Sequence, residues 1–72
     1  MEFINIDMVL PVNQEIQLQL TNSSGLQIQS TTTKGQRGLN QLKINTTNLS
    51  AGLYHLRITS GNEEAVRAFI IR

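Results

Sequence analysis

The sequence predicts an all-β domain, a small antiparallel Greek-key β-sandwich of the immunoglobulin-like type with about six to seven strands. Three observations support this prediction. Apolar and polar residues alternate along most of the chain, which is the pattern of strands with one buried face. Turns rich in glycine, asparagine and serine separate the alternating segments at short intervals. The one helical candidate, residues 47–50, is a single turn long and lacks an amphipathic run.

The length and the composition allow one small core. The 72 residues form a single domain, close to the lower size limit at which burial of apolar side chains stabilises a fold without cross-links. The chain has no cysteine, which excludes disulfides and thiolate metal sites, and no tryptophan. With one tyrosine and two phenylalanines, the core is expected to be mostly aliphatic.

The first half of the chain contains three alternating segments. We expect the first strand over residues 3–10 and the second over residues 15–21, which alternates without interruption. A turn around Gly25, which can supply a positive φ, leads to a third segment, residues 26–29, that repeats the pattern. The residues expected to face the core are Ile4, Ile6, Met8, Leu10, Ile16, Leu18, Leu20, Leu26 and Ile28.

The second half contains three further segments. Residues 41–45 and 53–59 alternate in the same way, and short turns are expected at residues 11–13, 34–38 and 60–62. In the second of these strands, Tyr54, Leu56 and Ile58 are expected to point inward and His55, Arg57 and Thr59 outward. The last strand, residues 64–71, is apolar on both faces. We therefore expect it to be central in its sheet or covered by a partner.

The sequence contains few residues that could act as catalytic groups or as ligands of a metal or cofactor. His55 is the only histidine and is expected to point outward beside Arg57. Glu63 and Glu64 are the only adjacent acids, and neighbours on a strand face opposite sides, so they cannot act as a carboxylate pair. No loop has the density of acids that calcium requires, and no glycine-rich segment leads from a strand into a helix. We expect no enzyme, no catalytic residue, no metal site and no cofactor.

The charge pattern argues against two classes of partner. The net charge is +1, and the six lysines and arginines are scattered along the chain. Nucleic-acid binding requires clustered cations that displace counterions from phosphates. Insertion into a membrane requires a run of roughly 18 apolar residues, and no run approaches that length. We expect neither nucleic-acid binding nor membrane insertion.

The most distinctive segment lies between residues 49 and 58. A leucine is followed by small residues, a glycine and a tyrosine, and then by an alternating strand that contains an arginine. Earlier in the chain, a glycine–hydrophobic–asparagine element at residues 38–40 precedes an aliphatic strand. The chain closes at residues 69–72 with an apolar strand that ends in a basic residue.

In their order and spacing, these elements resemble the type A C-terminal sorting domain of the bacterial type IX, or Por, secretion system. The resemblance covers about residues 3–72. Several of the matching positions also have a structural explanation, Gly52 as a turn position and Leu49 with Tyr54 as a packed corner. The residues that carry the resemblance, and are the candidates for recognition, are Gly38, Asn40, Leu49, Gly52, Tyr54, Arg57, Phe69, Ile70, Ile71 and Arg72.

The resemblance implies a non-catalytic sorting signal, excised from the end of a larger secreted protein, that directs cargo through the outer-membrane translocon. It further implies a route through the periplasm to the cell surface or the medium. A sortase-like protease is then expected to remove the signal and attach the cargo to surface lipopolysaccharide. Our hypothesis is that the machinery recognises the last two strands, with the exposed Arg57 and the terminal Arg72.

Two other functions remain open from the sequence. A carbohydrate-binding or adhesive module is one, although sugar sites generally use exposed aromatic rings as platforms and this chain has few aromatic residues. A spacer or interaction domain, whose edge strands add to the sheet of a partner, is the other. A homodimer through exposed edge strands is compatible with all of these functions.

Overall fold

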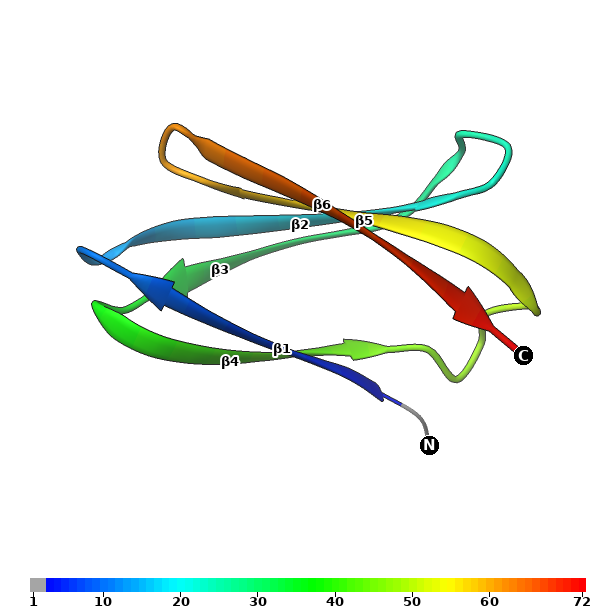
Figure 1. Cartoon of the computed structure of the whole chain (residues 1–72), viewed down its shortest axis with the longest axis horizontal. Helices are drawn as coiled ribbons and strands as arrows, with labels where there is room; N and C mark the ends of the chain where they lie inside the picture. The colour runs from blue at the N-terminus through cyan, green and yellow to red at the C-terminus, as the bar shows by residue number, and fades with distance from the viewer. Residues whose placement is uncertain (1–2) are drawn as a thin grey trace.

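Six antiparallel strands in two sheets make up the computed structural model, which describes residues 3–72 (Figure 1). No helix occurs in this described part of the chain, so the predicted all-β class is confirmed. The strands are β1 (Phe3–Leu10), β2 (Gln14–Asn22), β3 (Gln27–Gly35), β4 (Gly38–Asn45), β5 (Gly52–Ser60) and β6 (Glu63–Ile71).

The two sheets form a sandwich of unequal layers. Four strands form one sheet in the order β3-β2-β5-β6, and β1 pairs with β4 in the other. In Figure 1 the four-stranded sheet lies above the two-stranded one. The strands β2 and β5 are neighbours although β3 and β4 lie between them in the sequence, which is the kind of connection that Greek-key sandwiches make. The predicted sandwich is therefore confirmed.

The core lies between the sheets and is mostly aliphatic, as expected. Alternation directs the even-numbered residues of β1, β2, β4 and β5 inward, and Ile16 is 0% exposed. Full burial of such a side chain contributes about 1.5–3 kcal/mol. The buried apolar residues are Leu10, Ile16, Leu18, Leu20, Ile44, Tyr54, Leu56 and Ile58, and those packed against them are Ile4, Ile6, Met8, Leu42, Leu49, Phe69 and Ile71.

The third strand differs from its prediction in length and in orientation. It extends to Gly35, so the predicted turn at residues 34–38 is shorter than expected. Leu26 lies before the strand and is 65% exposed, and Ile28 is 39% exposed, so the expectation that both face the core is wrong. A register shift explains this result: Leu20 is opposite Gln29 while Thr21 is opposite Gln27, which leaves Ile28 as the extra residue of a bulge.

The last strand lies at an edge of its sheet. Within the described residues β6 pairs only with β5, so the expectation of a central position is wrong. Its odd-numbered apolar residues Phe69 and Ile71 pack against the core, while Val66 and Ile70 are 48% and 66% exposed on the outer face. The alternative, that a partner covers this strand, remains a prediction.

Candidate functional site

The loop between β4 and β5 forms a tight corner. The amide of Leu49 donates to the carbonyl oxygen of Thr46 at 3.1 Å, which closes the first turn of the loop. The hydroxyl of Tyr54, a residue only 5% exposed, donates to the carbonyl oxygen of Ser50 at 2.6 Å. A buried tyrosine that bonds to the backbone a few residues upstream is the tyrosine corner found in β-sandwiches. Leu49 packs against the core beneath it, so the expected corner is confirmed.

Gly52, the first residue of β5, has a backbone conformation that demands glycine. Its φ is +153°, and no heavy atom lies within 4 Å of the position that a Cβ would occupy. The requirement therefore comes from the backbone and not from lack of space. In the register of the hairpin, Gly52 is opposite Ile71 at the end of β6. Gly52 therefore lies where the corner loop enters β5 and where β6 ends beside it.

A second motif closes the turn between β3 and β4. The amide group of Asn40 donates to the carbonyl oxygens of Gln36 at 2.8 Å and Gly38 at 3.1 Å, and its Oδ1 accepts from the Gln36 amide at 2.9 Å. Gly38 has a φ of +98°, which favours glycine. The amide of Arg37 donates to Asn13 Oδ1 at 2.7 Å, which ties this turn to the β1–β2 connection. The glycine–hydrophobic–asparagine element therefore has a structural role.

An aromatic stack links the corner to the terminal strand. Tyr54 and Phe69 are directly opposite each other in the β5–β6 register. Their ring centroids are 5.7 Å apart with an interplanar angle of 17°. Such a pair contributes about 0.5–1.5 kcal/mol beyond the burial of its surface. Two of the candidate recognition residues therefore act together to hold β6 on β5.

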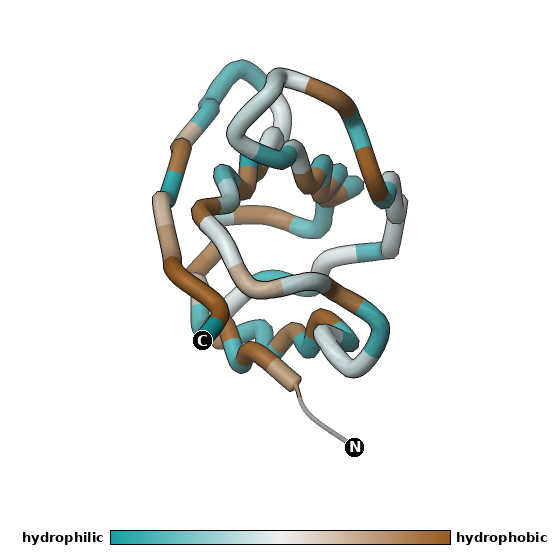
Figure 2. The backbone as a smooth tube through the Cα atoms, turned by 90° about the vertical axis from the view of Figure 1, so that its right-hand side faces the viewer, coloured by the Kyte–Doolittle hydropathy of each residue, from teal (hydrophilic) through white to brown (hydrophobic). Residues whose placement is uncertain are grey.

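The outer side of the β5–β6 hairpin combines apolar and charged residues. We call it the hairpin face. Across the hairpin, Leu53 is opposite Ile70 and His55 is opposite Ala68. Figure 2 shows that the strand leading to the C-terminus becomes strongly hydrophobic just before its last residue. The hairpin face consists of Leu53, His55, Arg57, Glu64, Val66, Ala68 and Ile70.

Arg57 makes an ion pair on the hairpin face. Its Nε lies 3.3 Å from Oε1 of Glu64, and the two side chains are 55% and 53% exposed. Ion pairs this exposed contribute only about 0–1 kcal/mol. Arg57 is thus weakly held, and its charge stays accessible to a partner.

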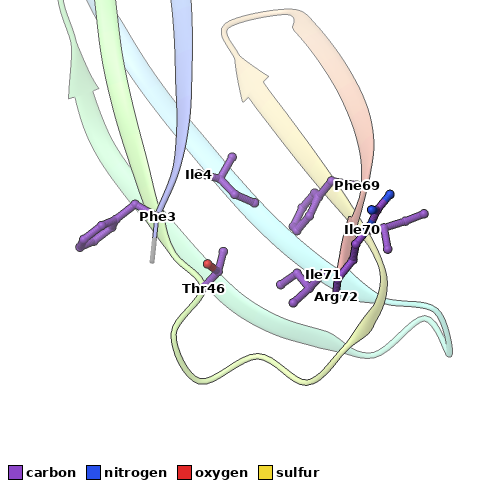
Figure 3. A pocket seen from close by; sticks show the side chains of 7 residues that line it. All are labelled: Phe3, Ile4, Thr46, Phe69, Ile70, Ile71 and Arg72. Atoms are coloured by element: carbon purple, nitrogen blue, oxygen red, sulfur yellow. The ribbon is translucent and has the colours of Figure 1, made fainter. Parts of the chain in front are cut away.

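A groove separates the start of β1 from the end of β6 (Figure 3). Ile4 and the ring of Phe69 point into it from opposite sides, whereas Phe3 and Ile70 point away. The groove has a volume of about 610 Å³. Neither β1 nor β6 has a strand partner on this side in the part of the chain that the structure describes. The groove is lined by Phe3, Ile4, Thr46, Phe69, Ile70, Ile71 and Arg72.

The candidate recognition residues do not form one cluster. Leu49, Gly52, Tyr54 and the terminal strand meet at the end of the sandwich where β6 finishes. Gly38 and Asn40 lie toward the opposite end of the strands, because they pair with Leu10 and Met8 at the end of β1. A single partner footprint therefore need not include the β3–β4 turn.

Sequence reasoning missed an exposed apolar pair on the outer face of the two-stranded sheet. Val9 is opposite Leu39, and the two residues are 74% and 61% exposed. Val9 is an odd-numbered apolar residue in a strand that buries its even-numbered ones, and that break in the alternation could have revealed it. Phe3 lies on the same face, with Lys43 Nζ 5.8 Å from its ring centroid.

The described residues contain neither a candidate metal-binding cluster nor a candidate membrane-spanning helix. Among residues 3–72, no group of three or more histidine, aspartate or glutamate residues could hold a metal ion. Over the same range, no helix is long and apolar enough to cross a membrane.

Comparison with known families gives one result. The sequence model of a family described as "Secretion system C-terminal sorting domain" matches residues 1–72, the whole chain. No curated protein and no solved structure matches the chain.

Proposed function

Since the chain belongs to the family of secretion system C-terminal sorting domains, we propose that its β5–β6 hairpin is the part that the type IX machinery recognises. The domain itself is a sorting signal for type IX secretion, and its cargo is secreted or displayed at the cell surface. The cargo precedes this domain in a larger protein, and the route runs through the periplasm. The signal acts without catalysis and without a cofactor.

The exposed edge of β6 is the observation that carries this proposal. An edge strand presents unpaired backbone N–H and C=O groups that can add to the sheet of a partner. On its outer face, β6 also presents Val66 and Ile70, 48% and 66% exposed, and the cationic side chain of Arg72 follows the strand directly. An apolar strand followed by a cationic side chain offers both backbone pairing and side-chain specificity to the machinery.

The other motif residues have a supporting role in the proposal. The hydrogen bond of Tyr54, its stacking on Phe69 and the conformation of Gly52 fix the position of β6. Gly38 and Asn40 shape the distant β3–β4 turn. We assign recognition to Arg57, Ile70 and Arg72. The motif residues near the corner position β6, whereas Gly38 and Asn40 serve the fold of the distant turn.

Removal of the signal is the later step of the proposal. Phe3, at the start of β1, and Arg72, at the end of the chain, line the same groove. A cargo that precedes Phe3 leaves the sandwich beside the strand that the machinery recognises. A sortase-like protease that cleaves before β1 then acts close to that site, and the cargo is attached to the surface.

The carbohydrate-binding alternative has little structural support. Tyr54 is buried and Phe69, opposite it on β6, is partly buried, so among the described aromatic residues only Phe3 is exposed, at 45%. Lys43 lies over the Phe3 ring, where a sugar would otherwise stack. A homodimer through an edge strand remains part of the proposal.

A secretion assay tests the proposed function. The chain is fused to the carboxyl end of a fluorescent protein that is exported to the periplasm of a bacterium with the type IX machinery. The reporter is expected at the surface or in the medium in that strain, and in the periplasm of a strain that lacks the outer-membrane channel. The same reporter without the chain is the control. Retention of the fused reporter in the periplasm of both strains contradicts the proposal.

A further inference from the structure

We infer that β6 pairs with β6 of a second copy of the chain, antiparallel, around a two-fold axis that passes midway between Ala68 and its own copy. The inference deepens the proposed function and rests on it in one respect, that β6 is also the strand that the machinery recognises. The observations that support it are the free edge of β6, the order of its residues, and the charges at its two ends.

The edge of β6 lacks most of the features that normally prevent pairing. Natural edge strands are protected by proline, by bulges, by short length or by charged side chains, and of these β6 has only the charges of Glu63, Glu64 and Arg67. The strand β6 is 9 residues long, contains no proline and pairs with β5 without a register shift. Its free edge can therefore accept a full strand.

Symmetry restricts the pairings that two copies can make. A two-fold axis perpendicular to the sheet passes between the two strands, and the residue nearest to it on one strand lies opposite its own copy on the other. Residues equally far on either side of the axis are opposite each other. The registers with the greatest overlap of apolar residues are therefore centred on Arg67, Ala68 or Phe69.

The register centred on Ala68 is self-complementary. Val66 lies opposite Ile70 of the second copy, so two side chains that are 48% and 66% exposed cover each other. Glu64 lies opposite Arg72 of the second copy, so opposite charges meet at both ends of the pair. Cross-strand pairs of both kinds stabilise a sheet.

The other two registers are poorer. Centring on Arg67 places this cation directly opposite its own copy, and like charges directly opposite are destabilising. It also sets Glu64 against the apolar Ile70. Centring on Phe69 shortens the overlap and sets Arg72 against Val66, with no acid available to pair with it. Charge and overlap therefore select the axis at Ala68.

The ion pair already present on the hairpin face joins this interface. Glu64 lies 3.3 Å from Arg57 of its own chain, and Arg72 of the second copy approaches the same carboxylate from across the axis. One acid then lies between two arginines at each end of the paired strands. Formation of the dimer covers the edge of β6, so dimerisation and recognition by the machinery exclude each other.

The size of the interface sets the concentration at which the dimer forms. One pair of strands buries less surface than the roughly 1,600 Å² of a stable interface. The dimer is therefore expected to be weak and to dissociate on dilution. At low protein concentration the chain is therefore expected to be monomeric, with β6 free for recognition and export.

Cysteine cross-linking reads the register directly, because the chain has no cysteine of its own. In the Ala68→Cys variant the two thiols lie opposite each other, where Cα atoms are about 4.5–5.5 Å apart, within reach of a disulfide. We expect diamide to convert this variant into a covalent dimer. The matched control is Val66→Cys, whose thiol is displaced from its own copy by four residues, about 13 Å. Equal cross-linking of the two variants overturns the register. So does the absence of a covalent dimer of Ala68→Cys at a protein concentration where the dimer forms.

Charge exchange tests the energetics in the purified chain. By sedimentation equilibrium, Arg72→Glu and Glu64→Arg are each expected to raise the dissociation constant about tenfold, because each places like charges opposite at both ends of the interface. The double variant restores the opposite charges and is expected to return the constant to near its original value. Glu63→Arg, outside the overlap, is the control and leaves it unchanged. A chain that stays monomeric at millimolar concentration, or a double variant without rescue, overturns the inference. None of these measurements depends on export, so the proposed function can stand or fall separately.

Discussion

The hydroxyl of Tyr54 donates a hydrogen bond of 2.6 Å to the carbonyl oxygen of Ser50, four residues upstream. This contact holds the first residues of β5 against the loop between β4 and β5. Because the Tyr54 ring also stacks on Phe69, the same side chain holds β6, the strand to which we assign recognition. This one tyrosine therefore contributes both to the corner and to the position of the proposed recognition strand.

Removing the Tyr54 hydroxyl is expected to weaken the corner without disturbing the stack. In Tyr54→Phe, the ring remains and the carbonyl oxygen of Ser50 loses its donor. The free energy of unfolding is expected to fall by about 1–3 kcal/mol, measured by urea denaturation. Ser50→Ala is the control, because it keeps the backbone acceptor and is expected to change stability by less than about 0.5 kcal/mol. Equal losses in the two variants contradict this account of the corner.

Adding a methyl group at Gly52 is expected to cost stability through the backbone alone. With φ at +153° and no heavy atom within 4 Å of a Cβ, Gly52→Ala meets backbone strain but no clash. The expected loss is about 1–3 kcal/mol in the free energy of unfolding. Ala51→Ser, at the exposed neighbouring position, is the matched control and is expected to be neutral. An unchanged midpoint of denaturation for Gly52→Ala argues against the constraint.

The turn between β3 and β4 is expected to depend on the Asn40 side chain. Asn40→Ala removes its three hydrogen bonds to Gln36 and Gly38. A loss of about 1–3 kcal/mol is expected from thermal or urea unfolding. Gln41→Ala, at the exposed next residue, is expected to have little effect. Since this turn lies far from the hairpin, Asn40→Ala is also expected to preserve export of whatever fraction stays folded.

Substitutions in the ion pair on the hairpin face distinguish a structural role of Arg57 from a role in recognition. Glu64→Gln breaks the pair but leaves the arginine charge, and we expect a stability change below about 1 kcal/mol and normal export. Arg57→Gln removes the charge at the same small cost in stability and is expected to lower export. The measurements are urea unfolding and the secreted fraction of the reporter. If both variants export equally, Arg57 has no role in recognition.

Alternation of apolar and polar residues suffices to predict strands with a uniform inner face. It places Ile16, Leu18 and Leu20 in the core, and all three are buried. It fails for β3, because the bulge opposite Leu20 and Thr21 shifts Ile28 and gives polar residues the inner positions. A bulge depends on how two strands pair, and one strand's pattern does not encode that pairing.

The position of β6 could not be predicted for a related reason. A strand that is apolar on both faces can be central, or it can be an edge strand with an exposed outer face. The choice depends on the order of strands in the sheet, which arises from the whole topology. The packed corner of Leu49 and Tyr54 was predictable because its residues are near in sequence, whereas the hydrogen bond from Tyr54 to Ser50 was not predicted. The exposure of Val9 could be predicted from the break in the alternation of β1, but its pairing with Leu39 could not, because the two residues come from different strands.

The central claim is that the machinery recognises β6, by its free edge and by the side chains on its outer face, and a matched pair of substitutions tests it most directly. Ile70 and Leu39 are outward-facing, 66% and 61% exposed, and lie on different sheets. Ile70→Glu and Leu39→Glu are both expected to change the free energy of unfolding by less than about 0.5 kcal/mol. In the secretion assay, Ile70→Glu is predicted to lower the secreted fraction about tenfold, as expected when a recognition residue worth about 1.4 kcal/mol is lost, whereas Leu39→Glu keeps it unchanged. Normal secretion of Ile70→Glu, or equal loss in both variants, contradicts the claim.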